Sequence, residues 1–299
     1  MSDDRRHALI VNPSSGGGRG GKSLPRVEEA MRASGIVFRT VISRDLEHGI
    51  SQALEASAGG EIPVVMSGDG LVGQIGGALA GRGATMGILP GGRGNDLARV
   101  LGIPSELDGA IAALADGAER EIDVGEVNGR RFLGIASMGF DSVANRVANE
   151  TRLIRGGLVY AYAALRTLAG WKTATFTVTL DDTDTFQVTG YAVAVANSRA
   201  FGGGMYIAPD ASLNDGRFDV VASGAVGKLR FLANLPKVFK GTHVDEDEVT
   251  VRRASTVEVV ADRPFEVYAD GEHLSDLPAR LRVLERALRV IAPPGAERR

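Results

Sequence analysis

The 299-residue chain contains no cysteine and one tryptophan, and aromatic residues make up only 5% of it. Without cysteine it can form no disulfide, thiolate nucleophile or cysteine–zinc site, which fits a reducing compartment. No run approaches the roughly 20 apolar residues that a membrane-spanning helix needs. Residues 1–11 also lack the apolar core of a signal peptide. We therefore expect a cytoplasmic protein, with any membrane contact peripheral and at the inner face.

The chain also lacks a strong excess of charge of either sign. It carries 34 basic and 37 acidic side chains, a formal net charge of −3. That balance provides no general electrostatic attraction for DNA or RNA, so we expect no nucleic-acid partner. Hydrophobic residues make up 44% and charged residues 24%, as is usual for globular proteins. The length suits one large or two ordinary domains.

Two patterns divide the chain. In residues 1–124, apolar strand-like runs alternate with helical patterns, which predicts an α/β domain whose parallel sheet is covered on both faces. In residues 125–292, short period-two stretches predict a β-rich, sandwich-like domain, with its last strand able to return to the first domain. Residues 293–299 are predicted to form a disordered tail. The fold class is thus α/β with two domains.

Three glycine-dense loops follow strand-like runs of the first domain. We call them the first (residues 12–18), second (67–70) and third (90–96) glycine loops. Glycines at the carboxyl ends of strands allow backbone N–H groups to close on phosphate. Taken alone, the first loop is as consistent with a flexible β–α connection as with a phosphate site. In the third loop, helix capping accounts for either Asn95 or Asp96, but not for both. Asp69 and Asp96 would repel phosphate unless they meet a metal ion or a hydroxyl, so the loops together favour Mg-nucleotide chemistry.

Two motifs stand out in the second region. Asn214-Asp215-Gly216 precedes a strand and is a strong turn signal, with a metal-binding loop as an equal alternative. Asp270-Gly271-Glu272 follows a strand and is also typical of a turn. Two carboxylates flanking a glycine can alternatively supply a general base.

In their order along the chain, these pieces resemble the diacylglycerol kinase catalytic family, in particular its soluble bacterial lipid kinases, with sphingosine kinases as more distant relatives. The resemblance rests on Asn12-Pro13, Gly68-Asp69-Gly70, Pro90 to Arg99, Asp123, Asn197 with Gly202-Gly203-Gly204, Ala208-Pro209, Asn214-Asp215-Gly216 and Asp270-Gly271-Glu272. It implies a nucleotide domain similar in fold to NAD kinases and phosphofructokinases, followed by a lipid-receiving domain.

The resemblance also implies site residues. ATP is expected at Asn12, Pro13, Ser14, Ser15, Gly16, Ser43, Ser67, Gly68, Asp69, Gly70, Leu71, Gly73, Arg93 and Asn95. Asp69, Asp96 and Asp123 match aspartates linked to catalytic Mg²⁺ through water. Asp215, with carbonyl groups near Ser212 and Arg217, matches a structural Mg²⁺ site. Glu272 matches the base and Asp270 its partner in the metal network, although the two roles can exchange.

The chain departs from the family pattern at three positions. Leu71 replaces a frequent threonine, Gln74 a frequent glutamate, and Arg93 a threonine. Loss of the hydroxyl at position 71 would weaken ATP binding by about 0.5–1.5 kcal/mol. Arg93 can compensate by gripping phosphate with its charged fork, or the changes mark reduced or altered activity.

The leading hypothesis is an ATP- and Mg²⁺-dependent kinase of diacylglycerol or a similar lipid. The alternatives are a kinase for a sphingoid base or other amphiphilic alcohol, and a catalytically weak nucleotide-binding regulator. The lipid would be reached at a membrane surface. Four arginines beside residues 158–168 form either a basic docking surface or solvated positions on a packed helix: Arg146, Arg152, Arg155 and Arg166. An edge strand of the β-rich domain can support a homodimer.

Overall fold

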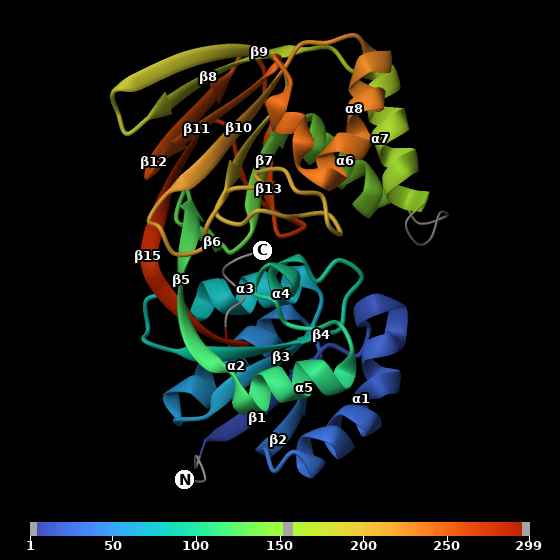
Figure 1. Cartoon of the computed structure of the whole chain (residues 1–299), viewed down its shortest axis with the longest axis vertical. Helices are drawn as coiled ribbons and strands as arrows, with labels where there is room; N and C mark the ends of the chain where they lie inside the picture. Colours follow the sequence, from blue (N-terminus) through green and yellow to red (C-terminus); the bar gives the residue numbers. More distant parts are fainter. Residues whose placement is uncertain (1–4, 152–157, 295–299) are drawn as a thin grey trace. The chain divides into compact units, whose positions relative to one another are not determined.

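The computed structural model describes residues 5–151 and 158–294 (Figure 1). Its contacts divide the chain into two compact units. Unit 1 comprises Met1–Val124, Leu213–Asp215 and Leu284–Arg299, and unit 2 comprises Gly125–Ser212 and Gly216–Val283. Residues 295–299 of the predicted disordered tail lie outside the described residues. Within the described ranges, no helix combines the length and apolar character needed to cross a membrane.

Unit 1 is built around a parallel sheet. Its elements are β1 Arg6–Val11, α1 Ser15–Ala33, β2 Val37–Ile42, α2 Leu46–Ala58, β3 Ile62–Ser67, α3 Asp69–Leu79, β4 Thr85–Pro90, α4 Asp96–Val100 and α5 Leu107–Asp116. The strand order β4-β3-β1-β2 is parallel throughout. The chain moves from β1 to β2 in one direction and then back past β1 to β3 and β4. Right-handed crossovers therefore place α1 on one face and α2 and α3 on the other.

The apolar pattern of these strands explains the layering. Every residue of β3 is buried, as expected for a central strand covered on both faces. Edge strand β2 contains only exposed and partly buried residues instead. Helices α2 and α3 pack against each other and against β3, while α5 packs against β4. The predicted parallel sheet with two helical layers is confirmed.

Unit 2 is dominated by antiparallel strands. Its elements are β6 Arg130–Phe132, β7 Ile135–Gly139, α6 Phe140–Glu150, α7 Leu158–Gly170, β8 Ala174–Leu180, β9 Asp184–Ala196, β10 Phe218–Gly224, α8 Lys228–Lys240, η1 Thr242–Asp245, β11 Val249–Ala254, β12 Thr256–Ala261, β13 Glu266–Ala269 and β14 Glu272–Asp276. Long β9 pairs with β8 along its first half, with β7 along its second half, and with β10 on the other edge of that half. Buried Phe132, Phe176 and Phe218 belong to one apolar core formed by these strands.

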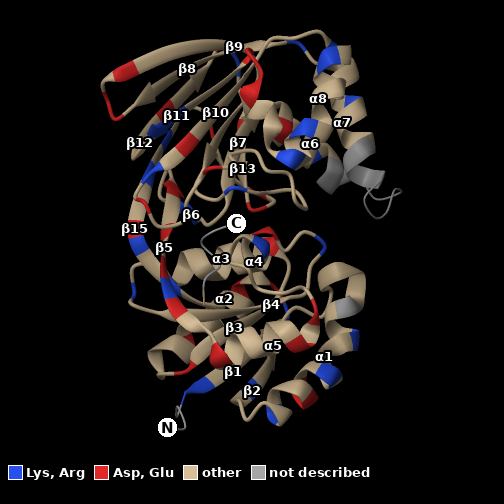
Figure 2. Ribbon diagram, in the orientation of Figure 1, with Lys and Arg blue, Asp and Glu red and all other residues tan. Residues whose placement is uncertain are grey.

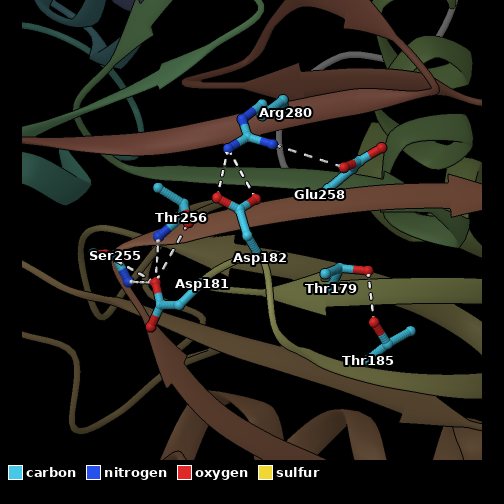
Figure 3. Close-up of polar contacts among 8 residues, drawn as sticks. All are labelled: Thr179, Asp181, Asp182, Thr185, Ser255, Thr256, Glu258 and Arg280. Atoms are coloured by element: carbon cyan, nitrogen blue, oxygen red, sulfur yellow. Dashed lines mark hydrogen bonds and ion pairs between the residues drawn. The ribbon is translucent and has the colours of Figure 1, made fainter.

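Polar contacts fix the turn between β8 and β9 (Figure 3). Asp181 and Asp182 both take positive φ, 46° and 61°, where aspartate is tolerated better than most residues. The Asp181 carboxylate accepts the backbone N–H groups of Ser255 and Thr256 at 2.9 and 3.0 Å. These hydrogen bonds lower the pKa of Asp181, with partial burial opposing them. Arg280 of β15 pairs with Asp182 at 2.9 Å, so the turn is bound to β15, to β12 and to Ser255, which precedes β12.

Two strands contribute to both units. Strand β5, Ala118–Val127, leaves unit 1 at Val124 and pairs with β6 from Gly125 onward. Strand β15, Ala279–Ala292, starts antiparallel to β12 and ends parallel to β4, where Val290 stands opposite Met86. Unit 1 therefore contains the second part of β15, from Leu284 onward.

Candidate active site

The three glycine loops emerge at one edge of the unit 1 sheet. The register aligns Val11 of β1 with Met66 of β3, and Ser67 of β3 with Pro90 of β4. The Asn12 N–H then donates to the Met66 carbonyl at 3.2 Å. Ligands of α/β sheets bind at this carboxyl edge.

The first glycine loop holds its backbone in an unusual conformation. Gly16, Gly17 and Gly18 all take positive φ, 59°, 77° and 89°, which side chains with a Cβ rarely adopt. The Asn12 side chain accepts the Ser14 N–H at 3.0 Å and the Ser14 hydroxyl at 2.7 Å. Consecutive N–H groups in such a turn form a concave surface suited to an anion.

The second and third glycine loops touch backbone to backbone. A Cβ on Gly92 would collide with the Gly68 Cα, and one on Gly91 would lie 3.1 Å from the Ser67 nitrogen. Glycine is therefore required at Gly92 for this close approach. The Gly92 N–H donates to the Asn95 side chain at 2.8 Å, and Asn95 itself takes φ 51°.

Hydrogen bonds to Asp69 connect the third glycine loop to the second. The Asp69 Oδ1 accepts the Asp96 N–H at 2.6 Å and the Leu97 N–H at 3.4 Å, the first amides of α4. Asn95 occupies the N-cap position of α4, as the helix-start interpretation expects, but its side chain makes no capping hydrogen bond. The side chain of Asp69, 27 residues earlier than Asp96, accepts the first amides of the helix instead. These contacts do not use Asp69 Oδ2.

The three unusual residues of the loops have different surroundings. Arg93 is exposed, and its Nη2 lies 3.4 Å from where a Cβ on Gly17 would be, which brings the first and third loops together. Leu71 is buried, with its Cδ1 directed at Gly49 of α2. Apolar packing thus explains Leu71 without reference to a ligand. Gln74 is half-buried in α3, and nothing in the structure explains its replacement of glutamate.

Other predicted nucleotide and metal residues are tied to the backbone. The Ser43 hydroxyl donates to the Val11 carbonyl at 3.1 Å, holding the end of β2 to β1. Asp123 is 1% exposed, and its Oδ1 accepts the Arg286 N–H at 2.7 Å. The Asp123 N–H donates to the Leu213 carbonyl at 2.5 Å, so the start of the Asn214-Asp215 motif lies beside Asp123 within unit 1. Asp215 is exposed.

Of the residues predicted for the structural metal site, Asp215 belongs to unit 1, and Ser212 and Arg217 belong to unit 2. Within residues 5–151 and 158–294, no three His, Asp or Glu side chains are close enough to hold a metal ion by themselves. Mg²⁺ in phosphoryl-transfer sites typically takes one or two carboxylates, waters and substrate phosphates. The oxygens of Asp69 and Asp96, adjoining phosphate-type loops, fit that donor set.

The hairpin β13–β14 of unit 2 carries the other predicted pair of carboxylates. Asp270 and Gly271 occupy the turn with φ 52° and 85°, so the turn interpretation is confirmed. The Asp270 oxygens accept the Leu133 N–H at 2.8 Å and the Gly134 N–H at 2.9 Å. Glu272 is exposed, yet partial desolvation raises its pKa, with Arg130 acting in the opposite sense.

Unit 2 also contains a partly open cavity of about 390 Å³ that no sequence motif predicts. Apolar side chains from α6, β9, β10 and α8 dominate its wall, among them Phe140, Val221 and Phe231. The Asp141 carboxylate is a polar group of the wall, and burial raises its pKa to about 6. The wall comes from segments distant in sequence, so no local motif signals the cavity.

The predicted arginine docking surface is only partly described. Arg146 pairs with Glu266 at 3.3 Å, and Arg166 donates to the Tyr162 hydroxyl at 3.3 Å. Arg152 and Arg155 lie outside the described residues.

Comparison with known proteins identifies the family. The diacylglycerol kinase catalytic domain model matches residues 6–127, and the YegS C-terminal NAD kinase beta sandwich-like domain model matches residues 134–292. A diacylglycerol kinase of Mycobacterium tuberculosis is 33% identical over 302 residues, which cover 97% of each chain. The chain belongs to this lipid kinase family. A Pseudomonas aeruginosa relative named probable lipid kinase YegS-like is 35% identical, covering 81% of this chain and 80% of the relative.

Solved structures extend the likeness to the fold of these lipid kinases. A diacylglycerol kinase structure from Bacillus anthracis has a TM-score of 0.76 at 20% identity and covers 99% of each chain. An Archaeoglobus fulgidus NAD kinase in complex with ATP has a TM-score of 0.52 at 14% identity, covering 98% of this chain and 96% of that one. The expected NAD-kinase-like fold and lipid kinase membership are confirmed, whereas the individual site residues stay predictions.

Proposed function

We propose that this lipid kinase transfers the γ-phosphoryl group of ATP to the hydroxyl group of diacylglycerol or a similar lipid, with Mg²⁺. The observation that carries the proposal is the glycine-loop cluster of unit 1. Close backbone packing at Gly68 and Gly92, with Arg93 beside Gly17, assembles three phosphate-type loops at one sheet edge. The apolar cavity of unit 2 adds a feature suited to a lipid.

The loops would bind ATP chiefly through backbone amides. Gly16, Gly17 and Gly18 form the left-handed turn, in which the Gly18 N–H already donates to the Ser14 carbonyl at 3.1 Å. Arg93 adds a cationic fork able to hold phosphate oxygens. Ser43 and Leu71 would act indirectly, since the Ser43 hydroxyl is bound to Val11 and the Leu71 side chain is buried. This assigns ATP positioning to unit 1.

Asp69, Asp96 and Asp123 would hold Mg²⁺ near the phosphates, directly or through water. When bound, Mg²⁺ supplies positive charge that offsets the negative charge of the phosphate oxygens. Asp69 is the best placed of the three, because its contacts with α4 use only Oδ1. Its bond to the Asp96 N–H also fixes the position of the Asp96 backbone.

Glu272 is proposed as the general base. The lipid hydroxyl oxygen forms a bond to the γ-phosphorus as the bond from that phosphorus to the bridging oxygen of ADP breaks, and the hydroxyl proton passes to a carboxylate. Asp270 is committed to the Leu133 and Gly134 amides, which suits a positioning residue. Partial burial raises the pKa of Glu272, which favours proton acceptance by that carboxylate.

The cavity of unit 2 is proposed to receive an acyl chain. Its volume of about 390 Å³ falls in the range of small-molecule sites, roughly 300–1,000 Å³. Apolar walls distinguish chain length weakly, so we expect the enzyme to accept several acyl chains. Access to such a substrate requires peripheral contact with a membrane, which we place at the inner face.

A lipid panel tests the proposed function. Purified full-length protein would be incubated with radiolabelled ATP, Mg²⁺ and dioctanoylglycerol, sphingosine or monoacylglycerol in detergent micelles. We expect the highest kcat/KM for the diacylglycerol, and loss of product when Mg²⁺ is chelated. Tight ATP binding without any phosphorylated lipid would reject the proposal. Preferred phosphorylation of sphingosine would reject the diacylglycerol assignment while retaining the kinase.

A further inference from the structure

Helix α8 is apolar on two sides. Its inner residues Phe231, Leu235 and Val238 line the cavity. A second apolar stripe faces solvent, because residues spaced by three or four positions share one helix face. The stripe consists of Leu229, Ala233 and Pro236, and Lys228 and Lys240 lie at its two ends. All five residues are exposed, and we call them together the outer face of α8.

The exposure of the outer face is unusual for a packed helix. The side chain of Leu229 is 84% exposed, and Phe239 at the rim of the cavity is 53% exposed. No residue of α8 is buried. Contiguous exposed apolar residues on a folded protein commonly mark an interaction surface.

The charges of α8 are all positive. It contains Lys228, Arg230, Lys237 and Lys240 and no acidic residue (Figure 2). Glu248 pairs with Arg230 at 2.8 Å, and Glu246 pairs with Lys237 at 2.5 Å. Lys228 donates instead to the neutral Ala169 carbonyl at 2.8 Å. Lys240 forms no ion pair within the described ranges. The two ends of the helix therefore retain positive charge that no described carboxylate offsets.

We propose that the outer face of α8 docks the protein on an anionic membrane. A helix with an apolar stripe between lysines lies in the interface of a bilayer, where the stripe enters the acyl boundary and the lysines meet anionic headgroups. The opposite side of the same helix lines the apolar cavity. Docking would thus place one helix between bilayer lipid and the cavity that we assign to an acyl chain.

The charge pattern favours a bilayer over a second copy of the chain. Two copies that met through this face would bring Lys228 and Lys240 of each against lysines of the other, and like charges at an interface oppose association. Anionic lipid complements both lysines at once. The docking inference does not depend on kinase activity, and its test measures binding alone.

Vesicle sedimentation of the full-length protein tests the docking surface. We expect binding to phosphatidylcholine vesicles that contain phosphatidylglycerol, and little binding to pure phosphatidylcholine. Leu229→Asp should weaken binding at least about 10-fold, since it removes an apolar side chain that docking would bury in the bilayer and adds a charge that anionic lipid repels. Lys228→Gln combined with Lys240→Gln should weaken binding about 25-fold at low salt, at roughly fivefold per lysine, and should reduce the salt dependence of binding.

Val260→Asp is the matched control. Val260 lies on β12 of the same unit and is 42% exposed, so the change adds the same charge at another exposed apolar position. Thermal melting would confirm that each variant is folded, and this control should bind like the wild type. Unchanged binding of both the Leu229 and the lysine variants would overturn the proposal. A dimer without vesicles that Leu229→Asp dissociates would overturn it in favour of a second copy.

Discussion

Asp69 in unit 1 and Asp270 in unit 2 use the same chemistry in different ways. Each follows the end of a strand and accepts two backbone N–H groups from a segment distant in sequence. Asp69 takes both through Oδ1, at 2.6 and 3.4 Å, whereas Asp270 uses one oxygen for each, at 2.8 and 2.9 Å. The first arrangement leaves an oxygen for a ligand. The second binds both carboxylate oxygens to backbone amides, which is why we propose Glu272 rather than Asp270 as the base.

Replacement of Glu272 is expected to have the largest effect, and it tests whether Glu272 rather than Asp270 is the base in unit 2. We expect Glu272→Gln to lower kcat by about 10²–10⁴-fold while the melting temperature stays close to wild type, because a general base contributes that much. Burial raises the pKa of Glu272, so wild-type activity should fall as pH drops through a value above 4.5. The variant should lack that limb of the pH–rate profile. If Glu272→Gln kept full turnover while a folded Asp270→Asn variant were inactive, Asp270 would be the base and Glu272 the positioning residue.

Asp69→Asn tests whether the Asp69 carboxylate of unit 1 contributes to catalysis as well as to the fold. The amide oxygen can still accept the Asp96 N–H, so the fold should survive, but the lost charge should reduce kcat by about 10²–10³-fold. Asp69→Ala should show the same loss and also destabilise by about 1 kcal/mol, since α4 loses its cap. Steady-state kinetics and urea unfolding measure the two effects. An Asp69→Asn enzyme with normal turnover would leave Asp69 a purely structural cap.

Asp270→Ala should affect stability first. Removing two charge-assisted hydrogen bonds is expected to lower the free energy of unfolding by about 2–4 kcal/mol. Urea denaturation of the full chain, followed by circular dichroism, measures the change. Asp270→Asn is the milder comparison, because its amide retains one acceptor oxygen. If Asp270→Ala unfolded at the wild-type urea concentration, the anchoring role of Asp270 would be wrong.

Asp141→Asn gives the smallest expected change and has the opposite sign. Burial raises the pKa of Asp141 from 3.8 to about 6, so the folded state holds a proton that the unfolded state releases between those values. Stability is therefore lost as pH rises through this window. The variant should be more stable than wild type by about 1–3 kcal/mol at pH 7 and equal below pH 4. Identical melting temperatures for the two proteins at pH 7 would contradict this account of the cavity wall.

Sequence patterns predict the features of this molecule that residues close together in the sequence determine. The buried run Ile62–Ser67 and its neighbours indicate a parallel sheet, because only a strand covered on both faces is apolar throughout. The Asp270-Gly271 turn follows from the positive φ that both residues tolerate. Asp69 as the cap of α4 was missed, since the helix begins 27 residues later and nothing in the spacing joins them. The cavity was missed for the same reason.

Strand β15 gives this chain a distinctive order of assembly during synthesis. Arg289 and Val290 stand opposite Thr85 and Met86 of β4. The first unit to leave the ribosome therefore lacks the neighbour of β4 until the last strand of the chain has emerged. A nascent chain stalled shortly before Arg289 would expose the edge of β4 with no partner, and an exposed strand edge is a template for aggregation. The sheet that carries the glycine loops is thus completed only after β15 has been synthesised.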